Sequence, residues 1–474
     1  MILSKNNIIK YAIMFLIAYL IGALPVFGNI TPYGMSVLGV FIAVVLGWIF
    51  IDTLPVTLCG FLMLLLFCEN SITNTISTGF SNVAVINILA STIFAGLIAE
   101  TYCFDYITNR LLRLPIIQKS PFYIIVCIFL LCVIGSFCGM GYAAIFLLWQ
   151  MVFSITDNSK IERKSPFVTY MLSTISILVL LTGLCFPWRS QTLMYVAIYN
   201  KDVFVNITYL QHMFLMFLFV LIFISLMLLI AKLLFASDLK KISLNYSYFK
   251  KQNIDFRQKL GLISVFLFTM IMLLPSILPT TSSLSEYINK FGIVGLTFIT
   301  LIVFSLVTTT NGEKMFNIET AHKMIPWEII WMLALVLPLG NIVQSDNCGI
   351  MKTIVDYLSP IFTALSPNLF MIVAVLTMCI LSQFLNNMVL ATILMPIFYS
   401  VSVEIGCNSY ALFICLMVAL HCDASTPAGS INGVVVHGNK DINKKYAYLV
   451  GMMQALISVI ICIVVLIPFA SLIG

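Results

Sequence analysis

Apolar runs of about 20 residues recur along the whole chain, separated by short polar segments. A helix of that length crosses the hydrocarbon core of a bilayer, which is roughly 30 Å thick. The pattern therefore predicts an all-α polytopic membrane protein with about 11 transmembrane helices. Nine of them are expected to be continuous, near residues 11–29, 33–50, 54–69, 83–101, 209–236, 260–279, 291–309, 326–344 and 447–471.

The other apolar segments are interrupted by small and polar residues. Two are predicted to be re-entrant hairpins, at 121–153 and 368–402, and two to be broken helices, at 166–199 and 408–437. In lipid, a backbone that leaves the helix must be buried in protein or line a cavity. Freed carbonyls can hold a cation, and freed amides at a half-helix N-terminus can hold an anion. Paired interruptions of this kind indicate a transporter with its site near mid-membrane.

The order of these elements predicts an internal repeat. Residues 70–236 and 260–474 each run through a helix, a short amphipathic segment, a hairpin, a broken helix and a further helix. An odd number of crossings separates the two copies, so they are expected to be inverted. Residues 1–69 would form scaffold helices, and the polar segment 237–259 a cytoplasmic linker between the repeats.

Composition and charge agree with a membrane protein and set its expected orientation. Hydrophobic residues make up 61% of the chain and charged residues 9%, with a net charge of +6, whereas a soluble domain carries about 25% charged residues. With the N-terminus inside and the C-terminus outside, almost all Lys and Arg residues fall on the cytoplasmic side. The exceptions are Lys201, Lys290 and Lys352 outside, and Arg189 within the membrane. This layout predicts an integral protein of a bacterial cytoplasmic membrane, with no nucleic-acid partner.

The order of elements resembles the divalent anion/sodium symporter family of the ion transporter superfamily, which carries di- and tricarboxylates or sulfate. The resemblance runs over nearly the whole chain. That family's hairpin signature is Ser-Asn-Thr with a proline nine residues after the Asn, and here Asn386-Asn387-Met388 is followed by Pro396. The family's Thr-Pro turn in the broken helix is similar to Thr426-Pro427.

The resemblance implies a secondary active carrier with sodium as its coupling ion, no other cofactor, and a homodimeric assembly. The matching positions imply a sodium site in the second half, with side-chain and main-chain oxygens from Ser382, Leu385, Asn387 and Ser425. They also imply that the anion touches the hairpin tip at Asn387 and Met388 and the turn at Thr426 and Pro427, together with first-half counterparts at Gly139 and Met140. Met388 replaces the family's Thr, so one hydroxyl contact to the anion is lost.

The first half departs from the family's pattern. Gly139-Met140-Gly141 stands where the Ser-Asn-Thr triplet is expected, so the side-chain oxygens for a first-half sodium are lost. An arginine within the membrane costs about 2.5–3.5 kcal/mol on insertion scales and usually faces a cavity or a partner. We expect Arg189 to replace the missing sodium and to grip a carboxylate. The alternative is a structural pairing with Asp423 or Glu100, or a position nearer the interface.

Asp423 and His421, just before the second break, are candidates for ion coupling. In one interpretation, Asp423 holds sodium or a proton and His421 serves as a group that titrates near neutral pH. In the other, Asp423 caps a half-helix or pairs with Arg189, and His421 is a hydrogen-bonded packing residue. The leading interpretation is a carrier of small divalent organic anions that works by alternating access, with fewer coupled sodium ions or with anion exchange. A proton-coupled or sodium/proton-exchanging relative is the alternative. A polytopic membrane enzyme is more distant, because the sequence carries no Gly-x-Ser-x-Gly, His-Glu-x-x-His or paired Asp motif.

Overall fold

The computed structural model describes residues 5–51, 53–199, 203, 207–242, 253–279, 282–308, 314, 325, 327–350, 352–353, 356–357, 365–426 and 431–473. Regular structure in these ranges is helical, apart from one isolated bridge between Thr308 and Lys314. The predicted fold class, an all-α polytopic membrane protein, is confirmed.

The first half of the chain contains thirteen of the helices. Their bounds are α1 Lys5–Gly22, α2 Pro32–Phe50, α3 Thr53–Cys68, α4 Ile72–Phe80, α5 Val83–Ala99, α6 Cys103–Leu112, α7 Pro115–Gln118, α8 Pro121–Phe137, α9 Tyr142–Asn158, α10 Pro166–Gly183, α11 Ser190–Tyr199, α12 Tyr209–Leu234 and α13 Ala236–Lys241. The helices of the second half are α14 Phe256–Leu273, α15 Ser283–Leu306, α17 Trp327–Gln344, α19 Pro367–Ser382, α20 Asn387–Glu404, α21 Ser409–Leu420, α22 Ile431–Gly438, α23 Lys444–Ile461 and α24 Ile467–Ile473. The predicted linker 237–259 thus contains most of α13 and the first turn of α14.

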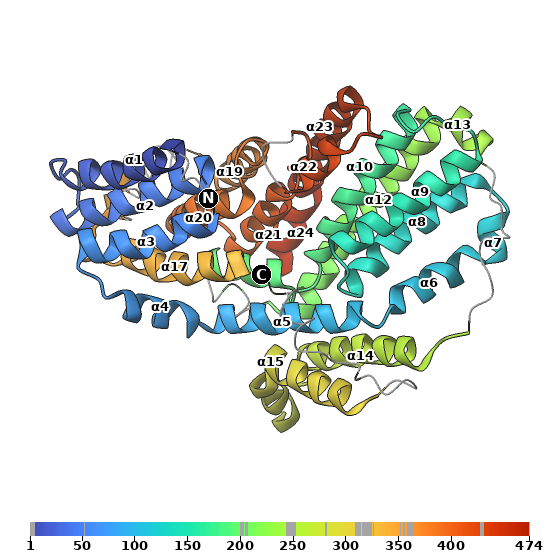
Figure 1. Ribbon diagram of the computed structural model, residues 1–474, viewed down its shortest axis with the longest axis horizontal. Coiled ribbons are helices and arrows are strands. Elements are labelled where there is room, and N and C mark those ends of the chain that lie inside the picture. The colour runs from blue at the N-terminus through green and yellow to red at the C-terminus, as the bar shows by residue number, and fades with distance from the viewer. Residues whose placement is uncertain are drawn as a thin grey trace.

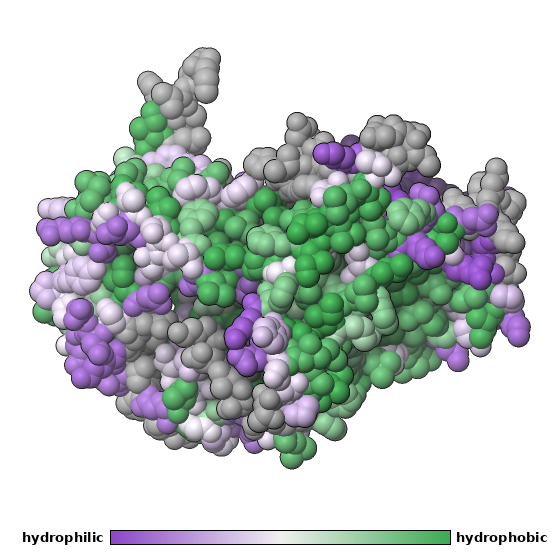
Figure 2. All heavy atoms as spheres, turned by 90° about the horizontal axis from the view of Figure 1, so that it is seen from below, coloured by the Kyte–Doolittle hydropathy of each residue, from purple (hydrophilic) through white to green (hydrophobic). Residues whose placement is uncertain are grey.

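Six of the described helical segments are long and apolar enough to cross a membrane, or seven if the bent pair α4 and α5 forms one span. Further apolar helices of 10–17 residues are α1, α2, α3, α8, α17, α19 and α21, counted over their described residues. Length and composition alone therefore do not test the predicted number of crossings. Hydrophobic side chains cover much of the face seen in Figure 2, as expected for a protein whose surroundings are lipid.

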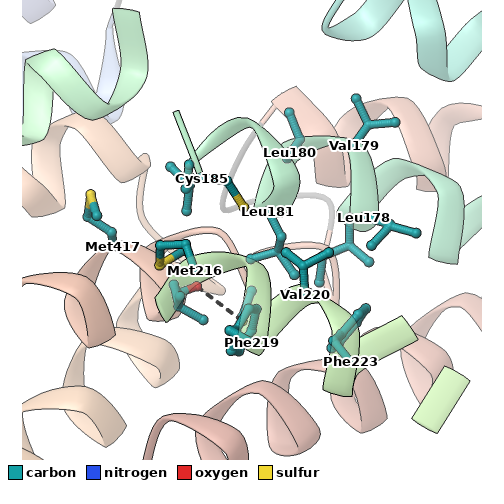
Figure 3. Packing of buried hydrophobic residues seen from close by; sticks show 14 of the residues in the cluster. Leu178, Val179, Leu180, Leu181, Cys185, Met216, Phe219, Val220, Phe223 and Met417 are labelled. Atoms are coloured by element: carbon teal, nitrogen blue, oxygen red, sulfur yellow. Dashed lines mark hydrogen bonds between the residues drawn. The ribbon is translucent and has the colours of Figure 1, made fainter. Parts of the chain in front are cut away.

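The helices form two hydrophobic cores. One core joins α1, α2, α3 and α17, which lie together at one end of the molecule (Figure 1). The larger core contains α8 to α12 and α19 to α24, with α10 buried along nearly its whole length. Leu178 and Leu181 of α10 pack toward Phe219, Val220 and Phe223 of α12 (Figure 3). This larger core surrounds the segments at which the helices are interrupted.

Ser-Pro pairs determine where the interrupted segments begin. Helices α8, α10 and α19 each start with proline directly after a serine, whose hydroxyl accepts a hydrogen bond from a backbone amide of the first turn. Serine is a favoured N-cap, and proline fits the first helical position because its missing N–H would be unpaired there. In the ranges of the predicted hairpins, α8 gives way to α9 across 138–141, and α19 to α20 across 383–386. The re-entrant and inverted arrangement stays a prediction.

Candidate functional site

The tip of the second hairpin is joined to the second helix break by a side-chain pair. Asn387 is the first residue of α20, and the side chain of Asn386 caps this helix by accepting a hydrogen bond from the Met388 amide at 2.9 Å. The Asn387 amide group donates a hydrogen bond to the carboxylate of Asp423, which is 1% exposed. Two residues expected to act in anion and ion binding, 36 positions apart in the chain, are thus in direct contact.

Gln383 makes further hydrogen bonds between hairpin and break, which the sequence did not indicate. Its Nε2 donates to the carbonyl of Cys422 at 2.5 Å and to that of Cys379 at 2.9 Å. In the opposite direction, the Thr426 hydroxyl donates to the Gln383 carbonyl. The position of Gln383 in the hairpin turn, four residues before Asn387, is the signal that could have identified it. These bonds hold the backbone of the break against the hairpin tip.

The expected sodium ligands lie in this region, and their oxygens differ in whether they are already hydrogen-bonded. Ser382 is fully buried, and its hydroxyl donates to the carbonyls of Cys379 at 2.8 Å and Ala419 at 3.3 Å. Among the described residues, the Ser425 hydroxyl and Oδ1 of Asn387 are buried without a hydrogen-bond partner. Leu385 lies in the hairpin turn between Ser382 and Asn387 and offers only its backbone. Pro427, the other half of the Thr-Pro turn, lies outside the described residues.

The break is packed tightly on α23 at Gly451. A Cβ built on Gly451 would lie 2.5 Å from Cα of Ser425 and 2.8 Å from its backbone nitrogen. These are backbone atoms, so the break or the helix would have to move.

We expect Gly451→Ala to destabilise the protein by about 1–3 kcal/mol, as overpacking of a buried contact does. Thermal unfolding of the purified protein measures this. Gly438→Ala on α22, where nothing lies within 4 Å, is the control and should unfold at the wild-type temperature or above; equal melting temperatures for both variants would contradict the prediction.

His421 is 3% exposed and directly follows α21. Its Nδ1 lies 3.0 Å from the carbonyl of Met417, and its ring meets Tyr195 of α11 edge-on at a centroid distance of 5.5 Å. These contacts are those of a hydrogen-bonded packing residue. The coupling role of His421 stays a prediction.

Arg189 lies at the first helix break, in the turn before α11. Its Nη2 donates a hydrogen bond to the carbonyl of Ser136 near the end of α8. Gly139 lies beside it: a Cβ built there would be 3.2 Å from Nη1, and its φ of +88° is one that glycine adopts without strain. Among the described residues, no carboxylate forms a salt bridge with Arg189. Glu100, one of the two partners considered for it, instead has its Oε2 at 3.9 Å from Nη2 of Arg257.

The Arg189 side chain borders an open cavity of about 410 Å³. The residues around it include Thr92, Ser136, Gly139, Met140, Gly141, Tyr142, Gly183, Arg189, Ser190 and Gln191. The cavity thus brings the three first-half candidates, Gly139, Met140 and Arg189, to one place. It offers one guanidinium together with hydroxyl and amide groups, a combination that suits an anion.

Two tyrosines mark the first-half cavity and the second-half break. Tyr142, at the start of α9, borders the cavity. Tyr195 of α11 is 2% exposed and meets the ring of His421, just before the break, edge-on. Because α11 begins with Ser190 and Gln191 at the cavity wall, this helix leads from the cavity to the break. Neither tyrosine carried a signal in the sequence, because their relevance depends on contacts between distant segments.

Comparison with known proteins bears on this arrangement. The sequence pattern of the citrate transporter family matches residues 41–420. The sodium-dependent dicarboxylate transporter SdcS of Staphylococcus saprophyticus is 25% identical over 171 residues, and that of Staphylococcus aureus (strain USA300) is 27% identical over 171 residues. Each alignment covers 35% of this chain and 32% of the relative, so the match spans about a third of the relatives' length. These matches confirm the resemblance to the ion transporter superfamily.

Proposed function

Since the chain belongs to the citrate transporter family, we propose that it is a secondary active transporter of small divalent organic anions, in particular dicarboxylates. Relatives described as sodium-dependent dicarboxylate transporters support this substrate class. Membership in a family of transporters also argues against the alternative of a membrane enzyme. The chain would reside in the bacterial cytoplasmic membrane with its N-terminus inside and its C-terminus outside, and it would act as a homodimer.

The observation that carries the proposal is the guanidinium of Arg189 at the wall of the cavity. Arg189 is half-buried and has no carboxylate partner among the described residues, and because such a cation is costly in a membrane, its presence at the cavity favours an anionic ligand. One Nη group is fixed by the Ser136 carbonyl, which orients the planar guanidinium. A guanidinium can then bind a carboxylate through two parallel hydrogen bonds. The second carboxylate would meet the other half of the site, at Asn387, Met388 and Thr426 with Pro427.

Sodium is the proposed coupling ion, bound in the second half. Among the described residues, Oδ1 of Asn387 and the Ser425 hydroxyl are buried without a partner. With the backbone of Leu385 and the Ser382 hydroxyl, they would provide the all-oxygen environment that hard cations require. The first hairpin tip offers Gly139 and Met140, which supply no side-chain oxygen. At the first hairpin tip, Arg189 would therefore provide the positive charge that a sodium ion would provide at an intact first-half site. Alternating access would move the hairpins and breaks against a scaffold formed by residues 1–69 and the outer helices of both repeats.

One observation favours a second candidate, a proton-coupled or sodium/proton-exchanging carrier. Asp423 is a carboxyl group that is 1% exposed, at the break itself. A buried carboxyl in the membrane is the kind of group that proton-coupled transporters use. In this alternative, Asp423 would alternate between a protonated and an ionised state, with His421 at its side.

Uptake of labelled dicarboxylates into proteoliposomes tests these proposals. We expect accumulation driven by an inward sodium gradient, because the second-half oxygens are retained. Uptake that requires unlabelled dicarboxylate inside, with no effect of sodium, would instead favour obligate exchange with Arg189 in place of the ion. Accumulation driven by a proton gradient alone would favour the second candidate. Absence of dicarboxylate uptake under all these conditions would contradict the proposed substrate class.

A further inference from the structure

Two buried thiols meet at the tip of the first hairpin. Cys138 directly follows α8 and is 2% exposed, and Cys103 is the first residue of α6 and is 1% exposed. Both cysteines are free. The Cys138 thiol donates a hydrogen bond to the sulfur of Cys103, so the two side chains are in direct contact. Two thiols in contact are the arrangement from which a disulfide bond forms.

The packing around the pair holds α6 against the end of α8. A Cβ built on Gly135 of α8 would lie 3.0 Å from Cζ of Phe104, the residue after Cys103. The chain turns sharply out of α5 at Tyr102, whose φ is +53°, and α6 begins at the next residue. Cys103 and Cys138 share one small hydrophobic core, and Figure 1 shows α6 beside α8. The contact between the thiols is therefore supported by the elements that carry them.

The surroundings of Cys103 favour its thiolate form, which is the nucleophile in thiol chemistry. Cys103 lies after the predicted span 83–101, at the N-terminus of the ten-residue helix α6. The hydrogen bond from Cys138 lowers the pKa of the Cys103 thiol, and hydrogen bonds from the backbone amides of Cys103 and Phe104 act in the same direction, although burial opposes them. A thiol with these neighbours, beside a second thiol, is typical of a redox-sensitive cysteine.

The pair is closer to solvent than the other contacting thiols are. Gly139, the residue after Cys138, borders the open cavity of about 410 Å³, and Tyr102, the residue before Cys103, is 55% exposed. A small neutral oxidant therefore has a route to this pair. Other thiol contacts in the described part of the chain belong to the larger core: Cys379 with Cys422, and Cys415 with Cys462.

We propose that Cys103 and Cys138 form a reversible oxidation site, whose disulfide bond fixes the tip of the first hairpin to α6 and stops transport. With hydrogen peroxide as the oxidant, the Cys103 sulfur takes one oxygen as the O–O bond breaks, which gives a sulfenic acid and water. The Cys138 thiol then attacks this sulfur, the S–S bond forms, and the second oxygen leaves as water. The two sulfurs together lose two electrons to the peroxide. A thiol such as glutathione restores both cysteines by thiol–disulfide exchange.

The site acts on transport through the hairpin tip. Cys138 and Arg189 border one small cavity of about 20 Å³, and Gly139 and Met140, the next residues of the tip, border the larger cavity. Alternating access would require this tip to move against the outer helices, and a disulfide bond to α6 would prevent that movement. The effect on uptake rests on the proposed function, whereas formation of the disulfide bond does not. In the proposed orientation α6 follows α5 on the cytoplasmic side, where thiols are kept reduced, so the bond would form only under oxidative conditions.

Treatment of the full-length protein in proteoliposomes with hydrogen peroxide tests the site. After alkylation of the remaining thiols, mass spectrometry of proteolytic peptides should identify a disulfide bond between Cys103 and Cys138, and dithiothreitol should remove it. Dicarboxylate uptake should be lost on oxidation and restored on reduction, whereas Cys103→Ala and Cys138→Ala should keep their uptake in the oxidant. Cys127→Ala is the matched control, because Cys127 of α8 is also 2% exposed but has no thiol neighbour among the described residues, and it should be inhibited like the wild type.

Alkylation of both thiols after the oxidant, or a disulfide bond between Cys379 and Cys422 instead, would overturn the inference. So would inhibition that persists in both alanine variants, or a disulfide bond between Cys103 and Cys138 that leaves uptake unchanged. A wild type that takes up no dicarboxylate before oxidation would contradict the proposed function, while the peptide analysis would still test the disulfide bond. Each alanine variant removes the pair by itself, so one of them suffices if the other yields no folded protein.

Discussion

Arg189→Gln is expected to raise the dicarboxylate concentration for half-maximal uptake by about 10- to 150-fold, because hydrogen bonds to charged groups contribute about 1.5–3 kcal/mol. The guanidinium lines the cavity beside Gly139 and has no carboxylate partner among the described residues, so a bound anion is the charge that it would meet. Glutamine keeps a hydrogen-bond donor for the Ser136 carbonyl but removes the charge. Initial rates of uptake into proteoliposomes over a range of substrate concentrations provide the measurement.

Two further variants separate charge from geometry and from folding. Arg189→Lys keeps the charge but loses the planar fork, so we expect an affinity between those of the wild type and Arg189→Gln. Arg163→Gln is the control: Arg163 is exposed, is bonded to Asp157 at 2.7 Å and to Asp441 at 3.3 Å, and is not one of the residues around the cavity. Exposed pairs contribute little, so uptake should keep the wild-type affinity. If Arg189→Gln lowered thermal stability but left the substrate affinity unchanged, Arg189 would be a structural residue.

The sequence predicted most helices because apolar runs of membrane length mark them, and several of their ends also carry local signals. The Ser-Pro starts of α8, α10 and α19 and the polar interruption at Asn386-Asn387 can be recognised without any tertiary contact. The first helix was placed too far along the chain: α1 ends at Gly22 rather than near 29, because Pro25 removes a backbone donor and disfavours helix before it. Helix α4, of nine residues, was missed because it is short and rich in Ser and Thr.

The candidate site was predictable only in part. Asn387 and Arg189 stood out because polar residues in apolar segments are unusual, and that signal lies in the sequence itself. The contacts of Gln383 and Tyr195 depend on which segments pack together. Gln383 illustrates the limit, since a single amide in an apolar segment indicates only a packing residue until its hydrogen bonds to the carbonyls of Cys379 and Cys422 are known.

Asp423→Asn is expected to reduce sodium-driven dicarboxylate accumulation by more than tenfold. The carboxylate accepts a hydrogen bond from Asn387 and lies at the break where Ser425 supplies a candidate ligand, so its charge would balance the bound cation. Asparagine has nearly the same size and removes that charge. Electrostatic interactions are strong in a medium of low polarity, so the loss of this charge would weaken sodium binding at the proposed position beside the break.

Uptake under separate sodium and proton gradients distinguishes whether Asp423 balances the charge of a bound sodium ion or carries a proton. If it balances sodium, the wild type responds to sodium, and Asp423→Asn loses that response while exchange against internal dicarboxylate continues. If it carries a proton, the wild type responds to the proton gradient instead, and the variant loses that response. Asp441→Asn is the matched control, because Asp441 is a partly exposed carboxylate paired with Arg163, and it should keep the wild-type response.

Asn387→Ala should resemble Asp423→Asn, since it removes both a candidate ligand oxygen and the donor to the carboxylate. Full sodium-driven accumulation in both variants would place the coupling ion elsewhere in the protein.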